Sequence, residues 1–185
     1  MHYATLRTHD VANGPGVRVS LFVSGCTHRC VGCFNEVAWD FAYGAPFDDA
    51  VQARLLSMLE PTYIAGLSLL GGEPMEPQNQ RALLPFLREV RRRFPKKTVW
   101  CYTGYVYEDE LLSPSRARCE VTDELLSLID ILVDGPFIEE KKSLRLRFRG
   151  SSNQRIIDLA ASRAEGKTVL CARLQDRIKT EEKDT

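Results

Sequence analysis

The chain has no excess of charge of either sign, because 25 lysines and arginines balance 25 aspartates and glutamates. A dedicated nucleic-acid binder usually carries a basic surplus, so the even balance argues against that class. No apolar run approaches the roughly 20 residues that span a bilayer. The first residues lack the basic-then-apolar pattern of a secretory signal. We therefore expect a cytoplasmic protein that binds neither membrane nor nucleic acid.

The sequence also lacks internal repeats and long low-complexity segments, and its 185 residues suffice for one domain with a hydrophobic core. We assign residues 1–175 to that domain. Residues 176–185 are polar and charged, a composition typical of a frayed terminal segment.

Short apolar, β-branched runs alternate with amphipathic helical patterns along the chain. This alternation predicts parallel βαβ units. Strands are expected at 17–23, 65–70, 98–102 and 129–133, with weaker candidates at 154–157 and 168–171. Helices are expected at 48–59, 79–94, 107–112 and 122–128.

A short polar or glycine-containing stretch follows each of the four stronger strands. The first is rich in cysteine and is called the cysteine loop below (residues 24–35); the others are 71–74, 103–105 and 134–136. In a parallel sheet all four stretches leave the same C-terminal edge, where α/β proteins build their ligand sites. We expect them to form one composite site.

Cysteines are the most informative residues, because three of the six fall within one stretch of eight residues. A reducing compartment disfavours a disulfide framework, so another reason for this crowding is needed. The clustered residues are Cys26, Cys30 and Cys33. The scattered ones are interpreted as small hydrophobic core residues: Cys101, Cys119 and Cys171.

The clustered thiolates are soft ligands, suited to iron–sulfur clusters, Cu(I) or zinc. A structural zinc site requires a fourth ligand, and His28 is close in sequence. A 4Fe–4S cluster normally takes four cysteines, so three would leave one iron open to a substrate. The triplet favours a cluster with three cysteine ligands and one open iron. A zinc site, or thiols without metal, are the alternatives.

The spacing of the triplet resembles the radical S-adenosylmethionine (SAM) superfamily, whose signature it is. Residues 13–18, Asn-Gly-Pro-Gly-Val-Arg, are similar to the Gly-Pro-Gly-x-Arg segment of the glycyl-radical activating enzymes. Residues 32–35 resemble the end of their cysteine loop, and residues 71–74 match their Gly-Gly-Glu-Pro motif.

Within that family, the short chain resembles the activases of anaerobic ribonucleoside-triphosphate reductases. Three further stretches carry this closer resemblance: 102–105, 133–137 and 147–155. The likeness runs from about residue 9 to residue 157, which is most of the chain.

The resemblance implies an α/β fold, an incomplete (β/α) barrel of about five to six mainly parallel strands. It implies that a reduced 4Fe–4S cluster held by Cys26, Cys30 and Cys33 cleaves SAM into methionine and a 5′-deoxyadenosyl radical. The radical would take a hydrogen atom from a glycine on the large catalytic subunit of an anaerobic ribonucleoside-triphosphate reductase. A flavodoxin- or ferredoxin-type protein would donate the electron.

Three other functions stay open. The chain could be an activase of another glycyl-radical enzyme of the pyruvate formate-lyase type, although the relatives of that type tend to be longer. It could be a radical enzyme that modifies a small nucleoside. It could also be a zinc-binding interaction module without catalysis, which leaves the Gly-Gly-Glu-Pro stretch unexplained.

Roles for further residues are also implied. Glu73 would accept hydrogen bonds from the ammonium of SAM, and Gly71 and Gly72 would let the strand edge approach its methionine part. Gly32 stands where the superfamily often has an aromatic residue before the third cysteine. Phe34, just after Cys33, is expected to contact the adenine instead.

Polar side chains of the last two stretches complete the predicted site. Thr103 and Asp134 would hydrogen-bond the ribose or the carboxylate region of SAM, and Asp134 the ribose, since a second carboxylate would repel it. Turn capping is their alternative role. Arg149 and Arg155 would pair with a cofactor carboxylate or a partner protein, or lie solvated on the surface.

Overall fold

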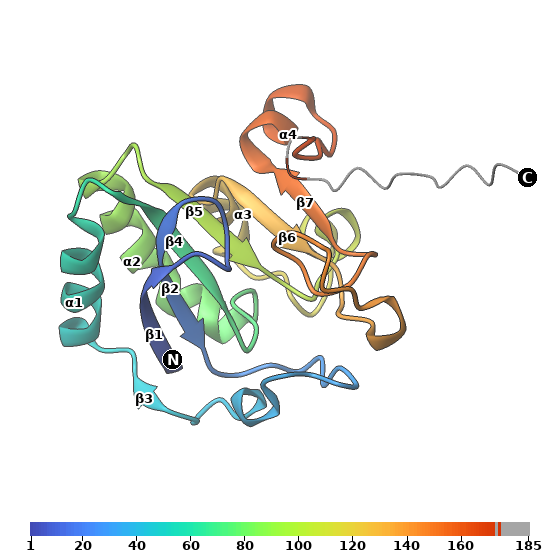
Figure 1. Ribbon diagram of the computed structural model, residues 1–185, viewed down its shortest axis with the longest axis horizontal. Helices are drawn as coiled ribbons and strands as arrows, with labels where there is room; N and C mark the ends of the chain where they lie inside the picture. The colour runs from blue at the N-terminus through green and yellow to red at the C-terminus, as the bar shows by residue number, and fades with distance from the viewer. Residues whose placement is uncertain (173, 175–185) are drawn as a thin grey trace, which may run out of the picture.

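The computed structural model describes residues 1–172 and 174, and their strands form one seven-stranded sheet (Figure 1). The sheet order is β3-β1-β2-β4-β5-β6-β7. The strands are β1 (His2–Asp10), β2 (Val17–Val23), β3 (Ala45–Pro46), β4 (Ile64–Gly71), β5 (Thr98–Tyr102), β6 (Ile131–Asp134) and β7 (Arg155–Asp158). The central strands β2, β4, β5 and β6 are parallel, whereas β1, β3 and β7 pair antiparallel at the two sides.

The helices of the described residues are α1 (Asp49–Leu59), α2 (Pro77–Arg93), α3 (Thr122–Ser127) and α4 (Leu159–Glu165). Single turns of other helix types cover Glu36–Trp39, Tyr107–Leu111 and Glu139–Lys141. α1 begins after Asp48, whose carboxylate accepts the amide hydrogen of Val51 at 3.0 Å, as an N-cap residue should. α2 begins with Pro77, because proline suits the first helical position. No helix of residues 1–172 is long and apolar enough to cross a bilayer.

Alternate residues of the central strands point to opposite faces of the sheet, and the two faces are packed differently. One face forms the main core with α1, α2 and α3; its strand residues include Val19, Leu21, Leu67, Leu69, Val99, Cys101 and Leu132. The other face carries a smaller cluster of Trp100, Ile131, Val133 and Ile156, against which Phe148 packs from the loop after β6. The space on this second face is where a ligand cavity can form.

Arg18 at the start of β2 is buried on this second face, with 1% of its surface exposed. Its guanidinium donates to the Ser68 hydroxyl at 2.7 Å and to the Leu67 carbonyl at 2.7 Å. It also donates to the hydroxyl and carbonyl of Thr98, both at 2.9 Å. Burial lowers the pKa of Arg18 to about 10, so it remains charged at neutral pH. The arginine of the Gly-Pro-Gly-x-Arg segment therefore ties the starts of three parallel strands together.

Replacing Arg18 by alanine is expected to lower the free energy of unfolding by about 3 kcal/mol, because buried oxygens lose their donor and a cavity is left. Urea denaturation at pH 7 measures this change. Arg54→Ala on the exposed surface of α1 is the matched control, expected to change stability by less than about 0.5 kcal/mol. Equal midpoints for the two variants would contradict the structural role of Arg18.

The structure confirms the α/β class and the strands at 17–23 and 98–102, and it corrects the predicted number of about five to six strands. Seven strands are present in the described residues, and the three outer ones are antiparallel. β1 was missed because Thr5, Arg7 and His9 give it a polar, exposed side. The weak candidate at 168–171 contributes only an isolated bridge, Ile157 to Leu170. The predicted frayed segment 176–185 lies outside the described residues.

Candidate functional site

A cavity of about 460 Å³ lies where the loops after β2, β4, β5 and β6 meet. In Figure 1 the cysteine loop leaves the arrowhead of β2 at the bottom of the view, the end at which the parallel strands finish. The predicted residues that line the cavity are Cys26, Gly32, Cys30, Cys33, Phe34, Gly71, Gly72, Glu73 and Thr103. The expected convergence of the four stretches is confirmed, with Gly135 representing the last of them.

Backbone hydrogen bonds join the beginning of the cysteine loop to the helical turn that follows the loop. The amide of Gly25 donates to the carbonyl of Ala38 at 2.8 Å, and that of Cys26 donates to Trp39 at 3.2 Å. Within the loop, the amide of Cys33 donates to the carbonyl of Cys30 at 3.2 Å. All three cysteines are partly buried free thiols.

The surroundings of Cys26 and Cys30 disfavour the ionised thiolate when no cation is near it. Burial and the negative charge of Glu73 raise the pKa of Cys26 to about 12, and burial raises the pKa of Cys30. A thiolate here therefore needs a cation beside it, which a metal centre supplies. The three soft donors on one loop, all lining one cavity, fit an iron–sulfur cluster.

Within residues 1–172 and 174, no three His, Cys, Asp or Glu side chains gather around a point that one metal ion would occupy. A cluster does not require such a point, because each of its irons takes a separate thiolate. The zinc alternative requires one, together with a fourth ligand. His28 is engaged elsewhere: Nε2 lies 3.0 Å from Glu73, and Nδ1 lies 3.4 Å from the guanidinium of Arg116.

Glu73 is a buried carboxylate with 1% exposure that links three of the loops. Oε2 accepts the amide hydrogen of Gly104 at 2.7 Å and faces His28, and Oε1 accepts the amide of Met75 at 2.8 Å. Burial lowers the pKa of His28, but the hydrogen bond and charge of Glu73 outweigh burial and raise it above its usual value. The His28 ring also packs on Tyr105, with ring centroids 4.2 Å apart.

The two glycines after β4 allow the cysteine loop to lie against that strand. Gly71 has a φ of +110°, which favours glycine. A methyl group on Gly72 would lie 2.7 Å from the Gly25 carbonyl oxygen and 2.9 Å from that of Ala38. The glycine at position 72 is therefore required by loop packing, in addition to any cofactor approach.

The remaining lining residues differ in how they are placed. Gly32 has a φ of +71°, and a methyl group on it would lie 2.5 Å from an Oε2 of Glu139. Phe34 is 85% exposed at the rim of the cavity. Thr103 is buried, and its hydroxyl accepts the amide hydrogen of Tyr105 at 3.1 Å, which is the turn-capping role weighed as its alternative.

Asp134, one of the predicted contact residues, does not line the cavity. Its carboxylate, 1% exposed, accepts the Tyr107 amide at 2.9 Å and pairs with Arg155, whose Nε lies at 2.9 Å. Arg155 also donates to Glu108 at 3.0 Å. Of the two predicted arginines only Arg149 lines the cavity, while Arg155 joins strands β6 and β7 to the turn after β5.

This ion-pair network makes a pH-dependent contribution to stability. The hydrogen bond from Arg155 holds the pKa of Glu108 at about 2, below its ordinary 4.5. A carboxylate with a lowered pKa in the folded state stabilises above its unfolded pKa, and that contribution is lost as the pH falls through 4.5 toward 2. Glu108→Gln is therefore expected to be less stable than the wild type at pH 7. The difference between the two urea midpoints should be smaller at pH 3 than at pH 7, and an equal difference at both pH values would contradict the pairing.

Sequence reasoning gave no role of their own to several residues of the site, although it placed Gly104 and Tyr105 in one of the four converging stretches. Tyr102, Gly104 and Phe148 line the cavity. Glu76 accepts hydrogen bonds from Thr27 of the cysteine loop and from the Tyr105 hydroxyl. Glu76 lies three residues beyond Glu73. The sequence signal for Glu76 was a carboxylate close to a glycine-rich turn and just before an amphipathic helix. Only the folded structure shows that this carboxylate is buried.

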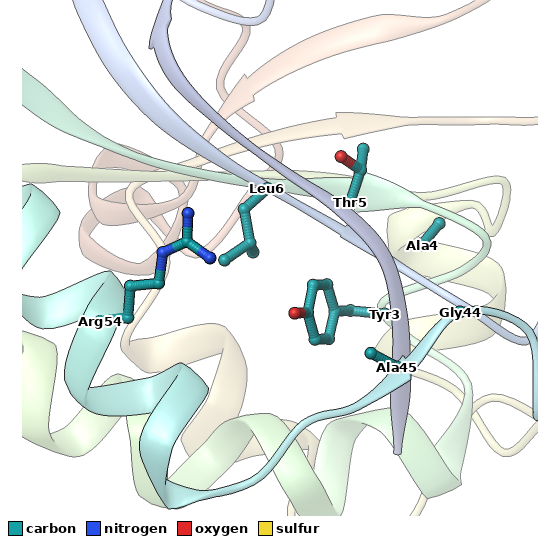
Figure 2. Close-up of a pocket in the computed structure, with 7 residues that line it drawn as sticks. All are labelled: Tyr3, Ala4, Thr5, Leu6, Gly44, Ala45 and Arg54. Carbon is teal, nitrogen blue, oxygen red and sulfur yellow. The ribbon is translucent and has the colours of Figure 1, made fainter.

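A second cavity of about 400 Å³ lies between the β1–β3 edge and α1 (Figure 2). Tyr3 and Leu6 point from β1 toward α1, and Arg54 extends from α1 toward them. None of its lining residues is Cys, His, Asp or Glu. It therefore lacks the thiol, imidazole and carboxylate groups that bind metals, and the cysteine-lined cavity is the candidate site.

Comparison with known proteins agrees with this choice. A family model described as "4Fe-4S single cluster domain" matches residues 12–157. A protein of Haemophilus influenzae is 44% identical over 156 residues, 83% of this chain and 96% of that protein. One of Escherichia coli K12 is 42% identical with 83% and 96% coverage, and one of Enterobacteria phage T4 is 38% identical with 84% and 93% coverage. All three are named anaerobic ribonucleoside-triphosphate reductase-activating protein.

Proposed function

Since this chain belongs to the family of anaerobic ribonucleoside-triphosphate reductase-activating proteins, with a 4Fe-4S single cluster domain, we propose that it generates a glycyl radical on the large catalytic subunit of such a reductase. The observation that carries the proposal is one cavity lined by all three clustered cysteines and by the Gly-Gly-Glu turn after β4. Soft thiolates beside a glycine turn at the carboxyl ends of parallel strands suit a cluster with a substrate bound next to it.

Cys26, Cys30 and Cys33 would hold the cluster and leave one iron open for SAM. When bound and reduced, the cluster supplies one electron, which breaks the bond between the sulfonium sulfur and the ribose carbon to give methionine and a 5′-deoxyadenosyl radical. That radical would take a hydrogen atom from the Cα of a glycine of the reductase and become 5′-deoxyadenosine, leaving the radical on the glycine. The loop anchors at Gly25 and Cys26 keep the thiols in place during this step.

The other lining residues would bind SAM. Each oxygen of Glu73 can accept more than one hydrogen bond, so the ammonium of SAM can share Oε1 with the Met75 amide, while Oε2 keeps the Gly104 amide and His28. Phe34 at the rim would cover the adenine. Thr103 would contact the ribose region. The predicted ribose contact of Asp134 requires its pair with Arg155 to open.

The proposal extends to the surroundings of the site. The sheet would act as an incomplete (β/α) barrel of the radical-SAM type, and its open side would admit the glycine loop of the reductase and exclude water from the radical. The electron would come from a flavodoxin- or ferredoxin-type protein in the cytoplasm.

A reconstituted activation assay tests the proposed function. The protein is loaded with iron and sulfide without oxygen, reduced, and mixed with SAM and purified anaerobic reductase. We expect a glycyl-radical signal in electron paramagnetic resonance (EPR) and 5′-deoxyadenosine in equal amount. A reductase whose radical glycine is replaced by alanine is the control. Radical formation on pyruvate formate-lyase but not on the reductase would assign the other target, and bound zinc without iron would contradict the radical chemistry.

A further inference from the structure

Glu76 connects the cysteine loop to the turn between β4 and α2. Its Oε1 accepts the amide hydrogen of Thr27 at 2.8 Å and the Thr27 hydroxyl at 2.6 Å. The same Oε1 accepts the hydroxyl of Tyr105 at 3.3 Å. Thr27 directly follows Cys26, so three hydrogen bonds on one oxygen restrain the chain beside the first cysteine.

The negative charge of Glu76 is not needed for these three hydrogen bonds. The side chain is buried, with 6% exposure. In the part of the chain that the structure describes, no lysine or arginine forms an ion pair with it. Because all three donors use Oε1, an uncharged glutamine would satisfy the same donors. Burying a carboxylate without a cation is unfavourable. The charge therefore needs an explanation other than these hydrogen bonds.

That charge lies next to the position where the cluster would bind. Glu76 contacts the residue after Cys26, and Glu73, a second buried carboxylate, lies at the same turn. A fixed negative charge near a redox centre disfavours the addition of an electron, and so lowers its reduction potential. A lower potential makes the reduced centre a stronger electron donor.

We infer that Glu76 is a positioning residue for the proposed cluster: its Oε1 holds Thr27, and thereby the Cys26 end of the cysteine loop, while its charge lowers the reduction potential of the cluster. This inference rests on the cluster part of the proposed function. It does not depend on SAM or on the reductase.

Three variants separate the two effects. Glu76→Gln keeps Oε1 and removes the charge, Glu76→Ala removes both, and Thr27→Val removes only the hydroxyl. Glu60→Gln is the matched charge control, because Glu60 is exposed at the end of α1. The measurements are the midpoint potential of the reconstituted cluster, the rate of iron loss to a chelator, and amide hydrogen exchange of residues 26–33 in the metal-free protein.

We expect Glu76→Gln to shift the midpoint potential to a more positive value than the wild type and Glu60→Gln show, with little change in iron loss. We expect Glu76→Ala to lose iron faster than Glu76→Gln and to show faster amide exchange in the cysteine loop. Thr27→Val should lie between the wild type and Glu76→Ala, and it tests the restraint if Glu76→Ala does not fold.

Equal potentials for Glu76→Gln and Glu60→Gln would overturn the role of the charge. Equal exchange and iron loss for Glu76→Ala and the wild type would overturn the restraint. A wild type that binds no iron would contradict the proposed function and the inferred charge effect, and the exchange comparison in metal-free protein would still decide on the restraint.

Discussion

Alanine at Cys26, Cys30 or Cys33 is expected to abolish SAM cleavage in each of the three single variants. The three thiols line one cavity, and among the described residues that line it there is no further cysteine. Each thiolate would hold a different iron, so the loss of one leaves a second iron without its ligand and the cluster unstable. Anaerobic reconstitution followed by chromatography for 5′-deoxyadenosine, together with iron analysis, measures both consequences.

Cys119→Ala is the matched control for these variants, because Cys119 is also a partly buried free thiol. It lies near Gln80 and Thr122, away from the cavity, and its iron content and cleavage rate are expected to equal those of the wild type. Full cleavage by any of the three triplet variants would contradict the assignment. Loss of iron from Cys119→Ala would identify a fourth ligand.

Gly72→Ala is expected to slow SAM cleavage by about 100-fold or more. The added methyl group would lie 2.7 Å from the carbonyl oxygen of Gly25 and 2.9 Å from that of Ala38. These are backbone atoms, so the cysteine loop itself must move away from β4. Displacements of about 1 Å at a reacting centre typically cost about a hundredfold in rate. The cleavage rate at saturating SAM, with iron content determined on the same sample, measures the effect.

Gly166→Ala separates the effect of the clash from that of any glycine replacement. Gly166 ends α4 with a φ of +64°, and a methyl group there meets no atom within 4 Å. The variant should lose about 1 kcal/mol of stability through its backbone conformation and keep the wild-type cleavage rate. A wild-type rate for Gly72→Ala would show that the loop does not rely on close contact with β4.

The parallel centre of the fold could be predicted because its strands have a simple local pattern. Val17–Val23 and Thr98–Tyr102 are short apolar runs between polar residues, and both were predicted with their observed bounds. β1 and α4 could not be found in this way. β1 is an edge-side strand with polar, exposed residues, and α4 has only seven residues with little apolar periodicity. Their formation depends on tertiary pairing, which a local pattern does not contain.

The site was predictable to the extent that its chemistry is local in sequence. Three cysteines on one loop and a Gly-Gly-Glu turn can be read directly, and the structure brings them to one cavity. The partners of Asp134 and Glu76 come from segments 21 and 49 positions away. Only the folded chain shows that Asp134 pairs with Arg155 and that Glu76 holds Thr27.

The most direct test of the central claim is an EPR spectrum of the anaerobically purified, reduced protein, recorded with and without SAM. The reduced protein should give the signal of a 4Fe–4S cluster whose shape changes when SAM is added, because SAM would bind to the iron that the three cysteines would leave open. No cluster signal, with one zinc ion per chain in the metal analysis, would contradict the proposed radical chemistry and support a zinc-binding module instead.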